Sequence, residues 1–336
     1  MKAVVVDRCG EAVWREVGDP PEPGPYEALV RTTAFSICNA TDTHLRDCRL
    51  MGATADRCPF LLGHESVGDV IELGPECRHL RAGDQIFRPM LSRPGYGSWW
   101  GGMAQYGLVT DRRAWQEDGS PPGPGGHQHQ QVLPHEIPPD HAVALITLKE
   151  VLSYLRMIHA SAGGRLLVTG QGPVGLAAVY LGRTMIDCER IVVAGRRPEA
   201  LKQAREFGAD AYVDTRAEGW PEVAIELLGD PAGAIYETTG DVRVTAGGLE
   251  ALAADGTLGP YAARTDEQAL EPLPEDDRYG PRGTDESLVH EEMIAATLAG
   301  RIDPERFITH RLEPEQIQHA FGLIACREAL KIVFAP

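Results

Sequence analysis

The stretch RLLVTGQGPVG, residues 165–175, decides the fold of this chain. An apolar run typical of a buried strand leads into a turn with three glycines, and an apolar segment with helical spacing follows. In this context the G-x-G-x-x-G pattern predicts a dinucleotide-binding turn, because the glycines permit a tight bend and a close approach to a pyrophosphate. The helix N-terminus would present free N–H groups to that anion. The residues predicted to bind the cofactor here are Gly170, Gly172, Pro173, Val174 and Gly175.

The end of the next predicted strand bears on the choice between NAD and NADP. NAD-preferring sites carry an acidic residue about 20 positions beyond the glycine turn. Here that position is Gly195, and Arg196 and Arg197 follow it. Two guanidinium groups could pair with a 2′-phosphate, and no carboxylate would repel it. The sequence therefore predicts NADP(H) in preference to NAD(H), with Gly195, Arg196 and Arg197 at the cofactor. The alternative is that both arginines only lie at the first turn of a helix and do not bind the cofactor.

Outward from the glycine turn, apolar strands alternate with helices to about residue 260, which predicts an α/β domain with a doubly wound parallel sheet. The first hundred or so residues read as short strands between Gly and Pro clusters, which is typical of antiparallel β-structure. We therefore predict a β-rich domain from residues 1–146 and 283–336 and a dinucleotide-binding domain from residues 147–282, with the active site in the cleft between them. The Pro- and Gly-rich stretch 118–131 is predicted to be a surface loop.

The charge of the chain restricts its partners. Its 336 residues include 32 Lys and Arg against 49 Asp and Glu, a formal net charge of −17. Nucleic acid and anionic membrane surfaces are therefore not expected as partners, since phosphate binding would work against the average field. No apolar run is long enough to span a bilayer, and charge interrupts the N-terminal apolar run early, so we expect no membrane association and a cytoplasmic location.

Seven cysteines are scattered through the chain without CxxC pairs. An odd number in a chain of this size argues against a disulfide scaffold, so most are expected to be reduced. One of them belongs to a group of metal-capable side chains in the segments Cys38–His44 and Gly63–Glu65. Thiolate, imidazole and carboxylate are the donors of zinc sites, and a catalytic site uses three of them and leaves one position open.

The order and spacing of these motifs resemble those of the zinc-dependent medium-chain alcohol dehydrogenase superfamily, in particular its branch with sorbitol and threonine dehydrogenases. The resemblance covers essentially the whole chain. It implies a GroES-like catalytic domain, a Rossmann domain, and a homodimer or homotetramer that oxidises a secondary alcohol of a polyol, sugar or cyclitol, or reduces the ketone. It rests on Met1–Val4, Ile37–His44, Gly63–Gly68, Gly74, Gly83–Asp84, Gly101–Tyr106, the glycine turn and Phe207–Asp210.

By this resemblance Cys38, His64 and Glu65 would bind one catalytic zinc, and Thr41 and His44 would form a proton relay. Asp42 would fix the loop that carries them. The chain departs from the usual pattern because two residues separate Cys38 from Thr41, one more than in many relatives.

Two further departures concern metals. The acidic position of the segment that usually reads Ala-Leu-Ile-Glu-Pro is Thr147 here, and Glu150 lies one helical turn further. Glu150 is therefore a candidate metal ligand or a neighbour of the ligands, and water is the alternative. The four cysteines of a structural zinc lobe are missing from residues 88–111, so a structural zinc is not expected.

Two other functions remain open at this point. One is a metal-free quinone or enoyl reductase of the same fold, which would lack the set Cys38, His64 and Glu65. The other is a nucleotide-binding protein that keeps the fold without turnover, since fold alone does not imply function.

Overall fold

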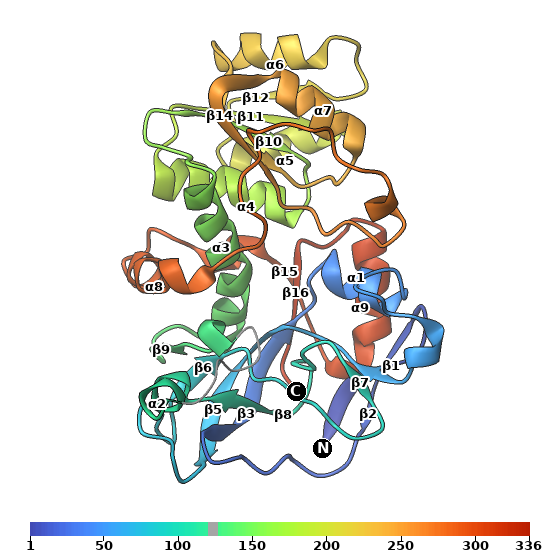
Figure 1. Ribbon diagram of the computed structural model, residues 1–336, viewed down its shortest axis with the longest axis vertical. Coiled ribbons are helices and arrows are strands. Elements are labelled where there is room, and N and C mark those ends of the chain that lie inside the picture. The colour runs from blue at the N-terminus through green and yellow to red at the C-terminus, as the bar shows by residue number, and fades with distance from the viewer. Residues whose placement is uncertain (120–126) are drawn as a thin grey trace. The chain divides into compact units, whose positions relative to one another are not determined.

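The computed structural model describes residues 1–119 and 127–336, and half of the predicted loop 118–131 lies outside the described residues (Figure 1). The chain divides into two compact units, Met1–Ile146 with His290–Pro336, and Thr147–Val289. The second unit thus continues past residue 282, where the sequence placed its end. In this last part of the unit Glu286 is buried, with its Oε2 3.8 Å from Nζ of the buried Lys149.

The first unit is rich in β-structure. In its larger sheet, the central strand β3 (Glu27–Ser36) pairs in antiparallel fashion with β5 (Glu65–Leu73). The order of this sheet is β15 (Ile308–Leu312), β16 (Lys331–Phe334), β3, β5, β6 (Gln85–Phe87) and β9 (Val132–Leu133), and β8 (Tyr106–Thr110) also pairs with β3. The smaller sheet has the order β2 (Glu11–Glu16), β1 (Lys2–Arg8), β4 (Phe60–Leu61) and β7 (Gly97–Ser98).

The register of the larger sheet places β16, near the end of the chain, across β3 from the start of β5. Ser36 at the end of β3 faces Glu65 in β5 on one side and Val333 in β16 on the other. An apolar core that includes the buried residues Val30, Val70 and Ile86 packs against this sheet. The first unit therefore brings residues near 36, 65 and 331 together on a rigid sheet.

The helices of the first unit are short. They are α1 (Thr41–Arg46), α2 (Arg112–Glu117), α8 (His290–Leu298) and α9 (Ile317–Ala325), and α3 (Pro139–Met157) begins in this unit and ends in the second. Among the described residues, none of the helices is long and apolar enough to cross a membrane.

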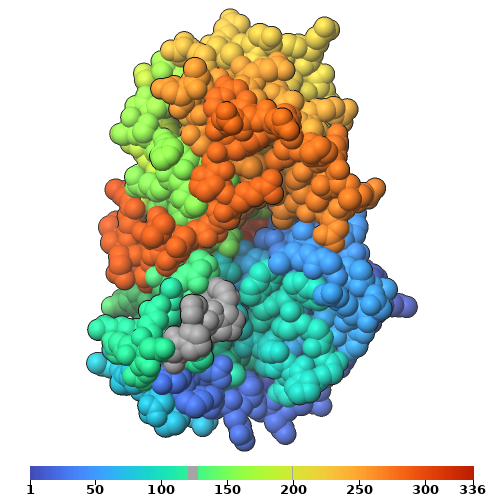
Figure 2. All heavy atoms as spheres, viewed as in Figure 1, coloured from blue at the N-terminus to red at the C-terminus, as the bar shows by residue number. Residues whose placement is uncertain are grey.

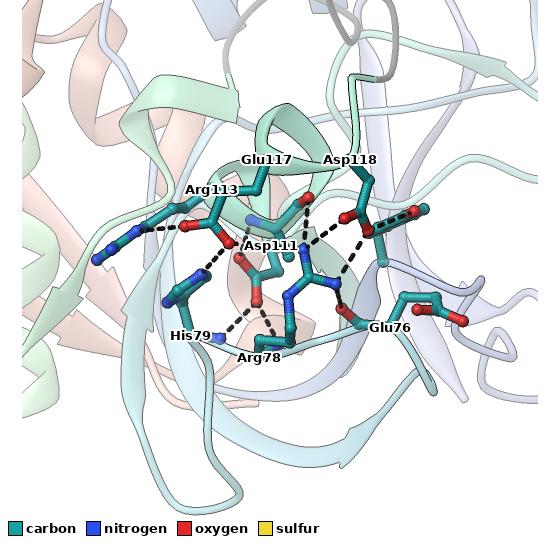
Figure 3. Close-up of polar contacts among 9 residues, drawn as sticks. Glu76, Arg78, His79, Asp111, Arg113, Glu117 and Asp118 are labelled. Atoms are coloured by element: carbon teal, nitrogen blue, oxygen red, sulfur yellow. Dashed lines mark hydrogen bonds and ion pairs between the residues drawn. The ribbon is translucent and has the colours of Figure 1, made fainter.

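Asp111 fixes the start of α2 (Figure 3). Its Oδ1 accepts a hydrogen bond from the N–H of Ala114 at 2.9 Å, which caps the helix, and its Oδ2 accepts the N–H groups of Arg78 and His79 at 2.7 Å each. The Arg78 guanidinium in turn donates to the Asp118 carboxylate at the other end of the helix. One carboxylate thus ties the loop at residues 78–79 to α2.

The second unit contains a parallel five-stranded sheet, as the alternating pattern predicted. Its order is β12 (Ala211–Asp214), β11 (Arg190–Gly195), β10 (Arg165–Thr169), β13 (Ala232–Glu237) and β14 (Leu252–Pro260). The helices that alternate with these strands are α4 (Pro173–Leu181), α5 (Leu201–Glu206), α6 (Trp220–Leu228) and α7 (Val242–Glu250). Leu167, Val192 and Ile235 are fully buried in its core, which explains the apolar character of the strands.

Two of the seven cysteines form a disulfide bond, which the sequence did not predict. Cys9 follows β1 and Cys48 follows α1, and their Cα atoms are 5.4 Å apart despite a separation of 39 residues. The other five cysteines are free thiols. The spacing along the chain carried no sign of this pair, because the fold alone brings the two turns together.

Candidate metal centre and nucleotide turn

The first unit brings Cys38, His64 and Glu65 together. One ligand atom of each lies within 4.8 Å of the others, and His64 and Glu65 are buried. Ligands around a tetrahedral zinc ion at about 2.0–2.3 Å are themselves roughly 3.3–3.8 Å apart. The pairing of β3 with β5 produces this arrangement, because Cys38 follows the end of one strand and His64 precedes the start of the other. The donor set and its spacing fit a divalent metal ion after small side-chain shifts.

Asp42 orients two of these donors. This fully buried carboxylate accepts the backbone N–H of Cys38 at 2.8 Å and lies 3.2 Å from His64 Nδ1. A proton on Nδ1 that points at Asp42 leaves the lone pair of Nε2 for a metal ion, an arrangement common among metal-binding histidines. Burial alone would lower the pKa of His64, but the Asp42 carboxylate and the Cys38 thiol outweigh it and raise this pKa well above its usual value.

Glu65 forms a buried ion pair that the sequence analysis missed. Its Oε2 accepts hydrogen bonds from Lys331 Nζ at 2.6 Å and from the Ser36 hydroxyl at 2.5 Å. Burial would raise the pKa of Glu65, but Lys331, His64 and Ser36 lower it from 4.5 to about 2. The signal in the sequence was a lysine at the head of the apolar strand β16, where its side chain cannot reach water.

The two predicted relay residues lie on α1. Thr41 begins this helix, and His44 lies near its end. Burial, followed by the positive charge of Arg49, lowers the pKa of His44. Within the described residues His44 Nδ1 and the Asn39 side-chain oxygen are buried without a hydrogen-bond partner. Buried polar groups are normally paired, and a bound polar ligand would supply these two atoms with partners.

A small pocket lies beside His64 within the first unit. The His64 and Trp100 rings have centroids 4.9 Å apart, and Arg88 Nη1 donates to the His64 carbonyl oxygen at 2.5 Å. The residues that line the pocket are His64, Arg88, Pro89, Met90, Trp100 and His129. Sequence patterns gave no sign of Arg88, because it lies in a loop.

Glu150, the fourth predicted ligand, belongs to the second unit. It lies on α3, and its Oε2 accepts a hydrogen bond from the Tyr261 hydroxyl at 3.1 Å. Its assignment as a metal ligand stays a prediction, as does the alternative of water.

The glycine turn bends tightly and leaves little room for side chains at two of its three glycines. Gly170 has φ +105°, and a Cβ atom there would meet the Thr238 hydroxyl at 2.1 Å. A Cβ atom at Gly175 would meet the Gly170 carbonyl oxygen at 2.3 Å, which is why α4 can lie so close to its strand. At Gly172, the N-cap of α4, a Cβ atom would have no neighbour within 4 Å. The open space lies where a pyrophosphate would approach the helix N-terminus.

The two arginines after Gly195 differ in their surroundings. Arg197 Nη2 donates to the Gln171 carbonyl oxygen at 2.8 Å, and the Gln171 side chain donates back to the Arg197 carbonyl oxygen at 2.9 Å. Arg197 therefore holds the glycine turn in place. Arg196 is exposed at the end of β11. The sequence treated the two residues as equivalent, but the structure gives Arg197 a bracing role.

Comparison with known proteins agrees with this arrangement. The family model of the alcohol dehydrogenase GroES-like domain matches residues 24–118, and that of the zinc-binding dehydrogenase matches residues 173–277. The chain is 30% identical to sorbitol dehydrogenase of Gallus gallus over 76% of this chain and 73% of that protein. It is 27% identical to an NADP-dependent isopropanol dehydrogenase of Thermoanaerobacter brockii over 96% of each. Among solved structures, alcohol dehydrogenase TADH from Thermus sp. ATN1 has a TM-score of 0.82 at 23% identity, over 100% of this chain and 99% of that one.

The fold and the two matched domains define a zinc-type dehydrogenase. The chain belongs to the zinc-dependent medium-chain alcohol dehydrogenase superfamily, and it is an NAD(P)-dependent oxidoreductase of that superfamily. The predicted fold class, a GroES-like catalytic domain with a Rossmann domain, is confirmed.

Proposed function

We propose that the protein is a zinc-dependent oxidoreductase that transfers a hydride between NADP(H) and the secondary alcohol or ketone of a polyol, sugar or cyclitol. The observation that carries the proposal is the convergence of Cys38, His64 and Glu65 on one buried position of the first unit. The substrate class follows from the similarity to sorbitol dehydrogenase. A small-molecule alcohol also suits the limited pocket beside His64.

The charges at this position favour a divalent cation. The Asp42 and Glu65 carboxylates outnumber the ammonium group of Lys331 there, and Cys38 would add a thiolate once it binds a metal ion. Cys38, His64 and Glu65 would hold a zinc ion there, with Glu150 or water as the remaining ligand. When bound, zinc would polarise the alcohol oxygen and NADP(H) would carry the hydride.

The chain's own residues have separate tasks in this reaction. Asp42 holds the proton of His64 on Nδ1, and Lys331 keeps Glu65 ionised. Thr41 and His44 would take the alcohol proton toward solvent. The low pKa of His44 keeps its imidazole neutral, and a neutral imidazole can accept a proton.

The preference for NADP(H) rests on Arg196. Its exposed guanidinium follows Gly195 at the end of β11, where a 2′-phosphate would need a cation and where an NAD-preferring site would carry a carboxylate. The relative from Thermoanaerobacter brockii, named as NADP-dependent, supports this preference. Arg197 would contribute by bracing Gly170–Gly175.

A substrate screen tests the proposal. Zinc-loaded protein is assayed with a panel of polyols, sugars, cyclitols and simple secondary alcohols, with NADP⁺ and with NAD⁺. We expect oxidation of at least one secondary alcohol, faster with NADP⁺, and its loss after chelation or in Cys38→Ser with NADP(H) binding retained. Full activity after zinc removal would favour a metal-free reductase, and cofactor binding without turnover of any substrate would favour a non-catalytic protein.

The metal content and the assembly complete the proposal. One catalytic zinc per disulfide-containing chain is expected and no structural zinc, because residues 88–111 contain no cysteine. We expect a homodimer or homotetramer, as the family resemblance implies. Metal analysis together with sedimentation equilibrium measures both numbers.

A further inference from the structure

Three cysteine sulfur atoms converge in the first unit, in a group that does not include Cys38. Cys9 and Cys48 are joined by the disulfide bond, and Cys58 is a free thiol. The three sulfur atoms all lie within 4.8 Å of one another. The three residues come from separate turns: the one after β1, the one after α1 and the one before β4. A structural disulfide requires two cysteines, so the third is unexplained by that role.

The backbone around this thiol group is fixed by contacts other than the disulfide. Strands β1 and β4 pair through Val6 and Phe60, which sets the distance between the turns of Cys9 and Cys58. The N–H of Gly10 donates to the carbonyl oxygen of Arg46 at 2.8 Å, which ties the turn of Cys9 to the end of α1. Reduction of the disulfide would therefore leave three thiols still gathered at one place.

The surroundings of Cys58 are unfavourable for a bare thiolate and favourable for a cation. Burial raises the pKa of the Cys58 thiol, and the carboxylates of Asp7 and Asp56 raise it further. Negative charge beside a sulfur donor opposes an isolated thiolate but attracts a metal ion that neutralises it. The chain around residue 50 also lies at the surface of the face in Figure 2, and the neighbouring residues 54–57 are exposed. An ion and a small reductant can therefore reach the group.

We propose that reduction of the Cys9–Cys48 disulfide opens a second metal site, in which Cys9, Cys48 and Cys58 bind a soft divalent cation of the zinc and cadmium class. A dithiol reductant supplies two electrons and two protons, so the disulfide becomes two thiols while the reductant becomes a disulfide. Metal binding then displaces one proton from each of the three thiols. Thiolate sulfur is the preferred donor for such ions, and water would complete four-coordination. The disulfide is the metal-free, closed form of the site.

A cadmium titration of the purified chain tests this proposal, with the sulfur-to-cadmium charge-transfer absorbance as readout. Disulfide-containing and dithiol-reduced, desalted protein are titrated without oxygen. We expect one additional cadmium ion per chain after reduction, with three further sulfur ligands. The increment on reduction is the measured quantity, so the test stays valid whether or not Cys38 binds metal.

Cys58→Ser should weaken the additional site at least tenfold, whereas Cys326→Ser, an exposed cysteine outside the group, should leave it unchanged. A measurement without mutation covers the case of a misfolded variant: cadmium should protect Cys9, Cys48 and Cys58 of the reduced native chain from alkylation, relative to Cys326. No increment on reduction, or no protection of Cys58, would overturn the proposal and leave an ordinary structural disulfide.

Discussion

Lys331 is the residue on which the charge state of Glu65 depends. Both side chains are buried, and their contact at 2.6 Å is accompanied by the hydroxyl group of Ser36. A buried carboxylate that loses its cation is costly because neither water nor another charge replaces it. Lys331 therefore stabilises the first unit and also keeps Glu65 ionised beside Cys38 and His64.

Lys331→Met should lower the free energy of unfolding by about 3–5 kcal/mol, because Glu65 remains buried without its cation. Chemical denaturation measures this loss. Lys331→Arg, which keeps the charge, should retain most of the stability, and Lys331→Met combined with Glu65→Gln should recover part of it. A Lys331→Met protein as stable as wild type would show that the pair contributes nothing.

The pH dependence of stability should carry a contribution from Glu65. The folded-state pKa of about 2 lies below the ordinary 4.5, so the carboxylate stabilises the fold above the ordinary value. That contribution should be lost as the pH falls from about 4.5 toward about 2. Unfolding measured across this range should show a smaller loss for Glu65→Gln, and identical profiles for the two proteins would contradict the assignment.

Arg196 and Arg197 should affect cofactor binding differently. Arg196→Ala should weaken NADP(H) by about 1–3 kcal/mol, through the lost charge-assisted contacts, and leave NAD(H) nearly unchanged. Arg197→Ala should weaken both cofactors, because its guanidinium braces Gln171 in the glycine turn. Fluorescence titration of each variant with NADPH and with NADH gives four dissociation constants, each of which is divided by the wild-type value. Equal losses of affinity for both cofactors in Arg196→Ala would show that Arg196 does not bind the 2′-phosphate.

At the scale of the elements, α2 depends on a single capping carboxylate. Burial raises the pKa of Asp111, but the N–H groups of Ala114, His79 and Arg78 outweigh burial and lower it. These bonds close the N-terminus of α2 and hold the loop at residues 78–79 (Figure 3).

Asp111→Ala should therefore cost about 1–3 kcal/mol of folding free energy, with three N–H groups left without their acceptor. The matched control is Asp118→Ala at the other end of α2, whose exposed contacts with Arg78 should be worth less. Thermal or chemical unfolding separates the two. Equal losses for the two variants would mean that the Asp111 cap stabilises the fold no more than the exposed contacts of Asp118 do.

The elements also show where sequence reasoning succeeded. The alternation after residue 165 and the glycine turn predicted the parallel sheet of the second unit, because buried parallel strands need continuous apolar runs. Cys38 and His64 could be assigned to one site from the sequence, because motif order and family resemblance supplied the fold that connects them. Lys331 could not be assigned to that site, since it lies 266 positions from Glu65 and contacts it only through the β16–β3–β5 register.

At the scale of the whole molecule, the two units divide the predicted chemistry. The first holds the donor group around Cys38, and the second holds the glycine turn with Arg196. The sequence placed the later boundary at residue 282, whereas the second unit runs to Val289. Within it Glu286 and Lys149 are both buried with their charged atoms 3.8 Å apart, a contact that polarity along the chain cannot reveal.

Cys38, His64 and Glu65 are proposed to share one zinc ion. X-ray absorption at the zinc edge, on zinc-loaded protein with the Cys9–Cys48 disulfide intact, tests it most directly. The predicted shell has one sulfur at about 2.3 Å and nitrogen and oxygen ligands at about 2.0–2.2 Å. A shell without sulfur, or with two or more sulfur atoms, would contradict the proposed centre.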